Sequence, residues 1–445
     1  MSRDIHKKKH LSSFQLIILG FEGVILMGAI ILMLPVSFAE RVMTRFNQTL
    51  FTSTSAVCVT GLAVLDTGSY WSVLGQVVIL LLIQIGGLGV VTVAVSVFML
   101  SGRKISLMQR STMQNAISAH KVGGIVRLTK FILKGTLFVE MAGALALLPV
   151  FYHDFGRKGI WMAVFHSISA FCNAGFDILG TPTNPFPSIT AYAGNPIVNV
   201  VIMFLIIAGG IGFLTWEDIC INKIHFRKYH MQSKIILVTT ALLIVLPAVF
   251  FFFSDFTHLS VGKRLLASAF QAVTPRTAGF NTMDISKMTE VSKAMIIILM
   301  LVGGSPSSTA GGMKTTTFAV LILNAFATFR SQENVETFGR RIECSVIKNA
   351  STIAMMYCML FLCGGITISV YEGLPLSECL YEAASAVGTV GLTLGITPKL
   401  HIVSQFILII LMYLGRVGGL TLIYAVLSKK KKGNARLPLE KITVG

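Results

Sequence analysis

The sequence predicts an all-α integral membrane protein with eight transmembrane helices, arranged as four helix, pore-loop, helix repeats around a central pore. Three observations lead to this fold class. Of the 445 residues, 54% are hydrophobic and 13% are charged, which leaves too few polar side chains to cover a water-soluble domain of this size. Apolar runs that could cross a hydrocarbon core, which takes about 20 helical residues, recur along the chain. Four glycine-containing segments also align with one another.

The apolar runs define the expected spans. They lie at residues 14–36, 70–100, 127–152, 195–219, 233–254, 291–329 with an interruption, 346–370 and 402–428. The first run continues past Leu34 without a small-residue cleavage site, so we interpret it as a span and not as a removed signal. The seven cysteines form no Cys-x-x-Cys pair, and His153 and His166 have no second ligand at metal spacing. Neither a disulfide framework nor a zinc site is expected.

The basic residues follow the expected loops. Of the 37 Lys and Arg residues, 25 lie in residues 1–12, 101–134, 218–234, 329–348 and 429–445, whereas 10 lie on the opposite side. This asymmetry predicts that both termini are cytoplasmic. The formal net charge of +18 could also suggest a nucleic-acid partner. The basic run 429–432 has no interleaved aromatic residue, so we expect no nucleic-acid binding.

Four segments align without gaps, and each ends in Gly followed by Leu or Phe. They are residues 52–62 (TSTSAVCVTGL), 166–176 (HSISAFCNAGF), 270–280 (FQAVTPRTAGF) and 382–392 (EAASAVGTVGL). Their glycines, Gly61, Gly175, Gly279 and Gly391, are 114, 104 and 112 residues apart. This period indicates four repeats, which we place at residues 13–100, 101–224, 225–330 and 331–428. Residues 1–12 and 429–445 are expected to be cytoplasmic tails.

Each repeat has the same expected order: a span, an amphipathic stretch too short to cross the membrane, the glycine segment and a second span. Lipid cannot satisfy the polar groups of a non-helical loop, so four such loops predict a shared central ion pore. Rings of backbone carbonyls can replace the hydration shell of K⁺, and Gly permits the positive φ that turns successive carbonyls inward. The C-terminal end of each short helix would also favour a cation.

The expected selectivity filter comprises three residues from each loop. These are Val59, Thr60, Gly61, Asn173, Ala174, Gly175, Thr277, Ala278, Gly279, Thr389, Val390 and Gly391. Thr-Val-Gly at residues 389–391 would by itself be an ordinary turn between helices. Four aligned copies, each after a non-spanning stretch, favour the filter.

The sixth span contains an interruption in which a continuous helix cannot form. It holds Gly303, Gly304, Ser305, Pro306, Ser307, Ser308, Thr309, Ala310, Gly311, Gly312 and Lys314. A flexible loop of small residues beneath a filter could occlude the ion path and still move, so we predict a gate. A loosely packed kink is the alternative. A phosphate-binding loop is excluded because Met313 separates Gly312 from Lys314.

Charges within or near the spans are further candidates. Arg416 lies in the eighth span, where it could face the ion path near the interrupted loop or form a structural salt bridge with Glu140 or Glu217. Lys314 has the same two interpretations. Asp66 and Asp177 follow the first and second filters, where carboxylates would concentrate cations at the outer mouth. They could equally be exposed loop acids without a role.

The chain resembles the Ktr/Trk/HKT superfamily of potassium transporters, and most closely its bacterial Ktr branch. The resemblance rests on the four filter segments together with residues 84–89 (QIGGLG), 209–213 (GGIGF), 303–317 and 415–418 (GRVG). It implies one pore per chain, a homodimer, the gate role for residues 303–314 and a bacterial cell membrane location. Gly61 implies K⁺ selectivity, whereas Asn173, Ala174 and Ala278 depart from Thr-Val-Gly and predict looser selectivity than a symmetric channel has.

The resemblance also implies stimulation by Na⁺ and a cytosolic ring of RCK-type regulatory subunits. ATP and ADP would bind to that partner, and no cofactor is expected in this chain besides the transported K⁺ and possible Na⁺. Membrane lipid is the remaining partner. A secondary active transporter of another cation or small solute is the alternative function, although such folds usually have two inverted repeats. An enzyme is not expected, because no acid, base or nucleophile set recurs in the spans.

Overall fold

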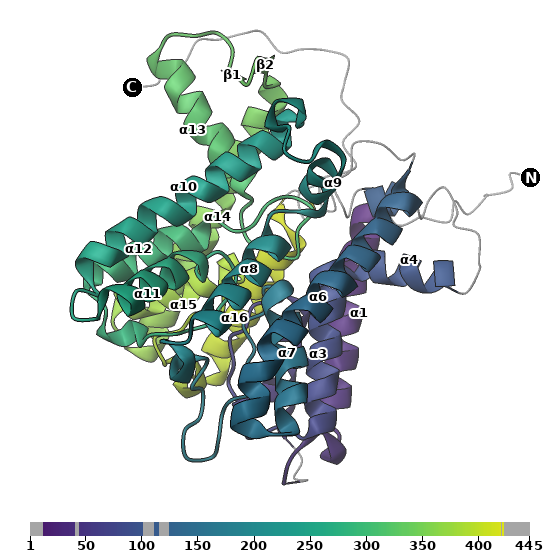
Figure 1. Ribbon diagram of the computed structural model, residues 1–445, viewed down its shortest axis with the longest axis vertical. Coiled ribbons are helices and arrows are strands. Elements are labelled where there is room, and N and C mark those ends of the chain that lie inside the picture. The colour runs from purple at the N-terminus through teal and green to yellow at the C-terminus, as the bar shows by residue number, and fades with distance from the viewer. Residues whose placement is uncertain (1–11, 41–43, 101–110, 115–123, 420, 422–445) are drawn as a thin grey trace, which may run out of the picture.

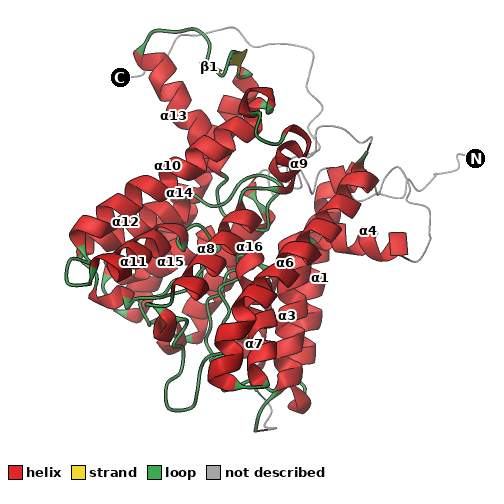
Figure 2. Cartoon of the chain, in the orientation of Figure 1, coloured by secondary structure: helices red, strands yellow, loops and turns green. Residues whose placement is uncertain are grey.

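The computed structural model describes residues 12–40, 44–100, 111–114, 124–419 and 421. The predicted N-terminal tail before Ser12, the basic tail and the end of the eighth span lie outside the described residues. Figure 2 shows that helices make up most of the described chain.

The helices repeat in the order that the sequence predicts, with a long first helix, a short helix and a second helix in each repeat. Repeat 1 contains α1 (Ser13–Leu32), α2 (Phe46–Val57), α3 (Val73–Leu88) and α4 (Val90–Leu100), and repeat 2 contains α6 (Ile125–Phe155), α7 (Lys158–Phe171), α8 (Pro196–Gly210) and α9 (Phe213–Asn222). Repeat 3 contains α10 (Met231–Ser254), α11 (Val261–Val273), α12 (Glu290–Leu301) and α13 (Thr315–Phe329), and repeat 4 contains α14 (Cys344–Glu372), α15 (Leu376–Gly388) and α16 (Ile402–Val417). A hairpin of β1 (Glu336–Thr337) and β2 (Arg340–Arg341) lies between α13 and α14.

Long apolar helices identify a multi-pass membrane protein. Among the described residues, α1, α6, α10 and α14 are each long and apolar enough to cross a membrane. The pairs α3 with α4 and α8 with α9 add up to two more spans, and α13 and α16 are shorter apolar helices. The interruption expected within residues 291–329 is confirmed, because α12 ends at Leu301 and α13 begins at Thr315. The count of eight spans stays a prediction.

Two second spans bend sharply, which corrects the sequence analysis. The axis turns by 99° between α3 and α4 and by 98° between α8 and α9, so residues 70–100 and 195–219 are not straight spans. Gly89 has φ 86° and ψ 131°, and Gly212 has φ 91° and ψ 140°. This conformation ends a helix and is accessible mainly to glycine. The interrupted sixth span is therefore not the only broken one.

The repeats close into a ring. Each second helix packs against the short helix of the next repeat: α3 against α7, α8 against α11, α12 against α15, and α16 against α2. Each short helix also packs against the long helix before it, as α6 does with α7. The four short helices are thereby enclosed at the centre of the bundle.

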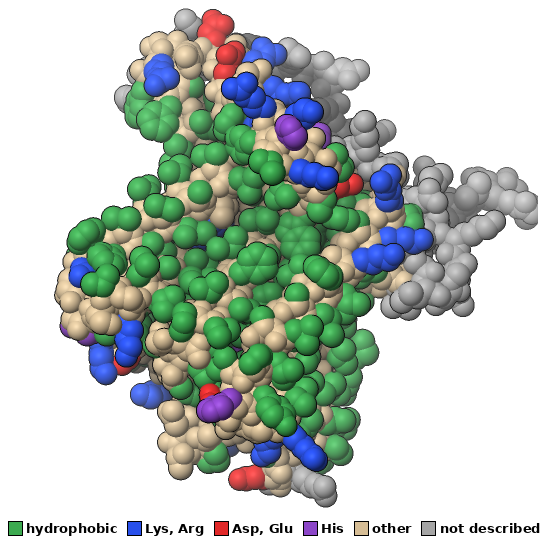
Figure 3. Space-filling view, in the orientation of Figure 1, with side chains coloured by type: hydrophobic (Ala, Val, Ile, Leu, Met, Phe, Trp, Pro, Cys, Tyr) green, Lys and Arg blue, Asp and Glu red, His purple; other side chains and the backbone are tan. Residues whose placement is uncertain are grey.

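The outer surface of the bundle is apolar. Side chains such as Phe138, Phe253 and Val370 are 73%, 70% and 82% exposed, and hydrophobic side chains cover much of the face in Figure 3. Single exposed apolar residues are normal on a soluble protein, but a surface covered by them favours lipid contact. The blue Lys and Arg side chains lie mainly around the edges of this face.

Candidate functional site: a four-loop ring and the loop beneath it

The four predicted filter loops share one backbone conformation. The first filter residue of each loop has positive φ: 55° at Val59, 58° at Asn173, 65° at Thr277 and 53° at Thr389. The glycine two positions later also has positive φ, at 86°, 69°, 80° and 94° in chain order. A non-glycine residue in this region costs roughly 1–3 kcal/mol and persists only where its surroundings enforce it. Such strain is typical of functional sites.

The four loops meet at their glycines. A β-carbon placed on any of the four glycines would clash with a carbonyl oxygen of the neighbouring loop. The distance would be 2.5 Å from Gly61 to Ala174 and 2.6 Å from Gly175 to Ala278. It would be 2.4 Å from Gly279 to Val390 and 2.2 Å from Gly391 to Thr60. Each loop thus contacts the next in chain order, and the last contacts the first. Backbone carbonyls of all four loops gather within this buried ring.

Each short helix ends directly at the ring. The helices α2, α7, α11 and α15 end at Val57, Phe171, Val273 and Gly388. The partial negative charge of a helix C-terminus therefore lies next to every loop. Together with the carbonyl ring, this arrangement favours cations over anions.

Glycines of the second helices let those helices press against the ends of the short helices. A β-carbon would lie 2.1 Å from the Val57 carbonyl oxygen if placed on Gly86, and 1.9 Å from the Phe171 carbonyl oxygen if placed on Gly209. Glycine at these two positions therefore allows close helix packing. Gly89 and Gly212, three residues farther along each chain segment, form the bends.

The interrupted sixth span forms a loop that reaches the ring. Its ends are joined, since the Gly303 amide donates to the Met313 carbonyl at 2.7 Å. A β-carbon on Gly311 would lie 2.2 Å from Oγ1 of Thr389, and one on Gly312 would lie 2.7 Å from the Gly388 carbonyl oxygen. The loop therefore lies against the start of the fourth filter segment. This contact places it at the end of the ring where the short helices finish.

The second repeat also holds this loop. Ser305 donates its amide to the Gly210 carbonyl at 2.9 Å, and the hydroxyl of Thr309 donates to the Phe171 carbonyl at 3.0 Å. The amide of Phe213, the first residue of α9, donates to the Ser307 carbonyl at 2.7 Å. A loosely packed kink would not show these bonds, so the loop is an ordered element beneath the ring.

Arg416 links this loop to the first repeat. Its Nη1 donates to the Thr309 carbonyl, and its Nη2 donates to the carbonyls of Gly86 and, at 3.2 Å, Gly87. Within the described residues Arg416 forms no ion pair, so the expected alternative of a salt bridge to Glu140 or Glu217 is wrong. Backbone carbonyls at the end of α3 replace the carboxylate.

Lys314 and Glu140 also find neutral partners. The ammonium of Lys314 donates to the Ala310 carbonyl within its own loop at 2.7 Å. The Glu140 carboxylate accepts from Nε2 of Gln84 at 3.3 Å, next to the Cys172 thiol. Neither group forms a salt bridge within the described part of the chain.

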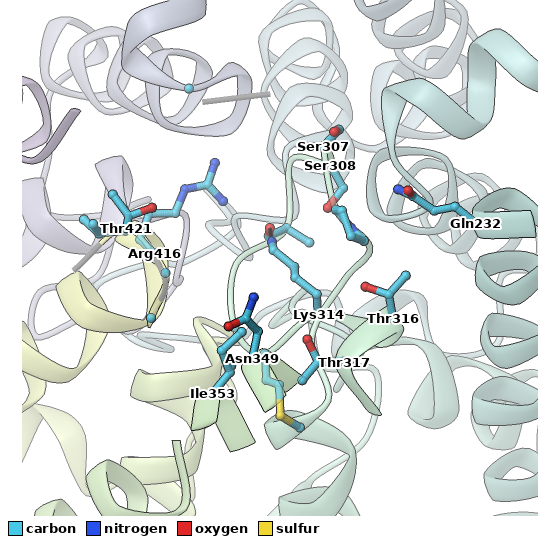
Figure 4. Close-up of a pocket in the computed structure, with 18 of the residues that line it drawn as sticks. Gln232, Ser307, Ser308, Lys314, Thr316, Thr317, Asn349, Ile353, Arg416 and Thr421 are labelled. Atoms are coloured by element: carbon cyan, nitrogen blue, oxygen red, sulfur yellow. Dashed lines mark hydrogen bonds between the residues drawn. The ribbon is translucent and has the colours of Figure 1, made fainter. Parts of the chain in front are cut away.

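A cavity of about 680 Å³ opens beside the loop. Lys314, Arg416, Ser307 and Thr317 line it, together with Asn349 from α14. Figure 4 shows these side chains around one space. The loop thus separates the carbonyl ring from a cavity that carries polar and cationic groups.

The two predicted outer-mouth carboxylates differ. Asp66 is buried, and its carboxylate accepts from the amide and hydroxyl of Ser69 at 2.7 and 2.6 Å and from the Phe186 amide at 2.8 Å. It is therefore not a free loop acid, because it ties the outer segments of repeats 1 and 2 together. Asp177 accepts from the Leu179 amide at 3.2 Å. Burial, and then the neighbouring Asp66 carboxylate, raise the pKa of Asp177 to about 7.

Comparison with known proteins places this geometry in a family. Residues 24–434 match the family described as TrkH, Cation transport protein. The chain belongs to this family. It is 38% identical over 450 residues to the potassium/sodium uptake protein NtpJ of Enterococcus hirae, with 98% of each chain covered. It is 37% identical over 438 residues to the Ktr system potassium uptake protein B of Bacillus subtilis, covering 97% of this chain and 96% of that protein.

A solved structure supports the fold of this TrkH-family chain. The crystal structure of the potassium transporter TrkH from Vibrio parahaemolyticus matches with a TM-score of 0.75, covering 96% of this chain and 86% of that one. At 17% sequence identity this likeness shows the fold alone. The family membership and the membrane fold expected from the sequence are confirmed.

Sequence reasoning missed three residues around the ring of this family member. Glu382 and Arg276 are buried beside the fourth and third loops, and Tyr357 donates its hydroxyl to the Gly415 carbonyl at 3.2 Å. Glu382 and Arg276 lie inside the aligned segments that the sequence analysis identified. A charged residue within a segment that is otherwise apolar or small was the signal that could have found them.

Proposed function

We propose that the chain mediates K⁺ uptake across the bacterial cell membrane through the four-loop ring. The observation that carries the proposal is the ring itself, in which each glycine lies against a carbonyl of the next loop. Such a ring can replace the hydration shell of K⁺. Gly61, the glycine of the first filter loop, supports selectivity for K⁺ over Na⁺ through the family resemblance. Two relatives, from Enterococcus hirae and Bacillus subtilis, carry potassium uptake in their names.

Residues 303–314 act as the gate in this proposal. The loop contacts Thr389 on one side and borders the cavity on the other, so an ion that leaves the ring must pass it. Its bonds to Arg416 and to α8 hold it closed. Opening must break the Arg416 bonds, since these connect the loop to the end of α3.

Control of the gate lies in partners of this chain. We assign it to a cytosolic RCK-type ring that binds ATP and ADP, acting on a homodimer whose termini are cytoplasmic. The name of the Bacillus subtilis relative, which refers to a Ktr system, supports a membrane subunit that works with other components. Na⁺ is proposed as a stimulating ion, in line with the potassium/sodium name of the Enterococcus hirae relative.

The test is cation flux in proteoliposomes that contain the purified protein. Rb⁺ uptake should be inhibited by external K⁺ and much less by Na⁺, and Gly61→Ser should abolish this preference. Deletion within residues 305–312 should raise flux in the absence of any regulatory subunit. Flux that is indifferent to substitution of all four ring glycines would overturn the proposal. Uptake that requires an inward Na⁺ gradient would instead support secondary active transport.

A further inference from the structure

Glu382 lies behind the fourth filter loop with all of its side chain buried. Its Oε1 accepts from the Thr393 hydroxyl at 2.5 Å and from the Leu394 amide at 3.1 Å. Its Oε2 accepts from the Thr397 hydroxyl at 2.6 Å. All three donors belong to the segment that follows Gly391. One carboxylate therefore holds the whole outer end of this loop.

The bonds around Thr393 extend this network. The Thr393 hydroxyl oxygen accepts from the Gly395 amide at 2.9 Å, and the Thr397 hydroxyl lies 3.2 Å from it. Hydrogen bonds to a charged acceptor are roughly twice as strong as neutral ones. A carboxylate has only acceptor sites and suits a set of three donors. The outer segment is thus a compact turn built around the Glu382 carboxylate.

The same short helix also holds the filter itself. The Ser385 carbonyl accepts from the Val390 amide at 2.8 Å, and the Ser385 hydroxyl accepts from the Gly391 amide at 3.0 Å. Ser385 follows Glu382 by three residues, which places both on one face of α15. Loop 4 is therefore attached to α15 on both sides of its ring carbonyl, at Ser385 and at Glu382.

The other repeats do not use a carboxylate here. The residues aligned with Glu382 are Thr52, His166 and Phe270. Thr52 and His166 bond back to Gln48 and Met162 of their own helices. The second and third loops are instead held by hydroxyl groups that donate to the carbonyl after the glycine, from Ser169 to Phe176 at 2.7 Å and from Thr274 to Phe280 at 2.6 Å.

We propose that Glu382 is a positioning residue that determines cation discrimination, because it fixes the outer end of loop 4 and with it the carbonyl of Val390 in the ring. The selectivity of a carbonyl ring depends on the number, field and spacing of its oxygens. Loosening one loop of four lets the ring contract around the smaller Na⁺. This inference rests on the proposed K⁺ function.

The experiment compares K⁺ and Na⁺ inhibition of Rb⁺ uptake in proteoliposomes, with matched reconstitution, for the wild type, three single variants and the double variant Glu382→Gln with Thr393→Val. Glu382→Gln removes the charge at almost unchanged volume. Thr393→Val removes one of the three donors and leaves the carboxylate intact. Glu378→Gln is the matched control, because Glu378 is on the same helix and its side chain forms no hydrogen bond within the described part of the chain. Size-exclusion profiles and thermal unfolding in detergent verify that each variant is folded.

We expect Glu382→Gln to reduce the preference for K⁺ over Na⁺ roughly tenfold, as the loss of hydrogen bonds to a charged group implies. Thr393→Val should shift the preference in the same direction. The change in preference of the double variant should be smaller than the sum of the two single changes. Glu378→Gln should behave as wild type.

Two outcomes would overturn the inference. One is a folded Glu382→Gln protein with unchanged preference. The other is a preference that changes with Glu382→Gln and Glu378→Gln alike but not with Thr393→Val, since that pattern shows a charge effect without positioning. Absence of K⁺-sensitive flux in the wild type would refute the proposed function instead, so the two failures are distinguishable.

Discussion

Gly391 and Thr60 come from the fourth and first repeats, yet a β-carbon on Gly391 would lie 2.2 Å from the carbonyl oxygen of Thr60. This contact closes the ring of loops. A real β-carbon essentially never lies within 3.0 Å of a heavy atom outside its own residue and its two chain neighbours, and both partners here are backbone groups held by their own helices. Any side chain at Gly391 must therefore displace a carbonyl that lines the ring.

Gly391→Ala should reduce Rb⁺ uptake by more than about tenfold. The reason is that a misaligned carbonyl weakens the binding of the ion in the ring by more than roughly 1.4 kcal/mol, which corresponds to a factor of ten in rate. Gly395→Ala is the matched control. Gly395 has nearly the same φ, 90° against 94°, but nothing lies within 4 Å of its β-carbon position. Both variants bear the strain of a positive φ, and only one bears the clash. Equal uptake by the two variants would show that strain, and not ring geometry, limits transport.

The ring could be predicted from the sequence because it repeats. Four aligned segments at even spacing, each after a stretch too short to span, identify Gly61 and its three equivalents without any coordinate. The bends at Gly89 and Gly212 could not be predicted in the same way. Hydropathy runs unbroken through both positions, and an apolar residue carries no information on the direction of the helix axis.

The roles of the other glycines were ambiguous for a related reason. Gly86 and Gly209 allow close packing, whereas Gly89 and Gly212 adopt positive φ. In sequence all four are glycines within an apolar run. The partners of Arg416 were equally hidden, because it bonds to backbone carbonyls, which every residue carries.

Gly209→Ala should destabilise the protein. A β-carbon at this position would lie 1.9 Å from the Phe171 carbonyl oxygen, whereas on Gly210 it would meet only Nδ2 of Asn173 at 3.3 Å. Alanine gains about 1 kcal/mol of helix propensity over glycine at either site. Overpacking against fixed backbone costs typically 1–3 kcal/mol or more, so the clash decides the sign at Gly209. Thermal unfolding in detergent should show a lower midpoint for Gly209→Ala and an unchanged or higher one for Gly210→Ala.

Arg416→Lys should raise Rb⁺ leak several-fold in the absence of a regulatory subunit. A guanidinium can bond Thr309 and Gly86 at the same time, whereas an ammonium on a similar stem is a single point donor. The variant keeps the positive charge, so a change in Rb⁺ leak must come from losing the simultaneous bonds to Thr309 and Gly86. Arg341→Lys is the control, because Arg341 lines the same cavity but bonds to Asn334 in the hairpin region. If the Rb⁺ leak of Arg416→Lys equals that of the wild type, the bonds of Arg416 do not hold the loop closed.

Asp255 should make the stability of repeat 3 depend on pH. It follows α10, and its carboxylate accepts from the Thr289 amide at 2.9 Å, from the Ser254 hydroxyl at 2.5 Å and from the Ser292 hydroxyl, so it joins the outer ends of α10 and α12. Burial would raise the pKa of Asp255, but these hydrogen bonds outweigh it and hold the pKa below its ordinary value.

A depressed pKa stabilises the folded protein fully above the unfolded pKa of about 3.9, and this stabilisation is lost as the pH falls through the folded pKa. Asp255→Asn lacks this stabilisation at every pH, because an amide does not ionise. The unfolding midpoint of Asp255→Asn should therefore lie below that of wild type at pH 7, and the gap should narrow once the pH falls below about 4. A gap of constant size across the same pH range would mean that the ionised carboxylate does not join the two helices.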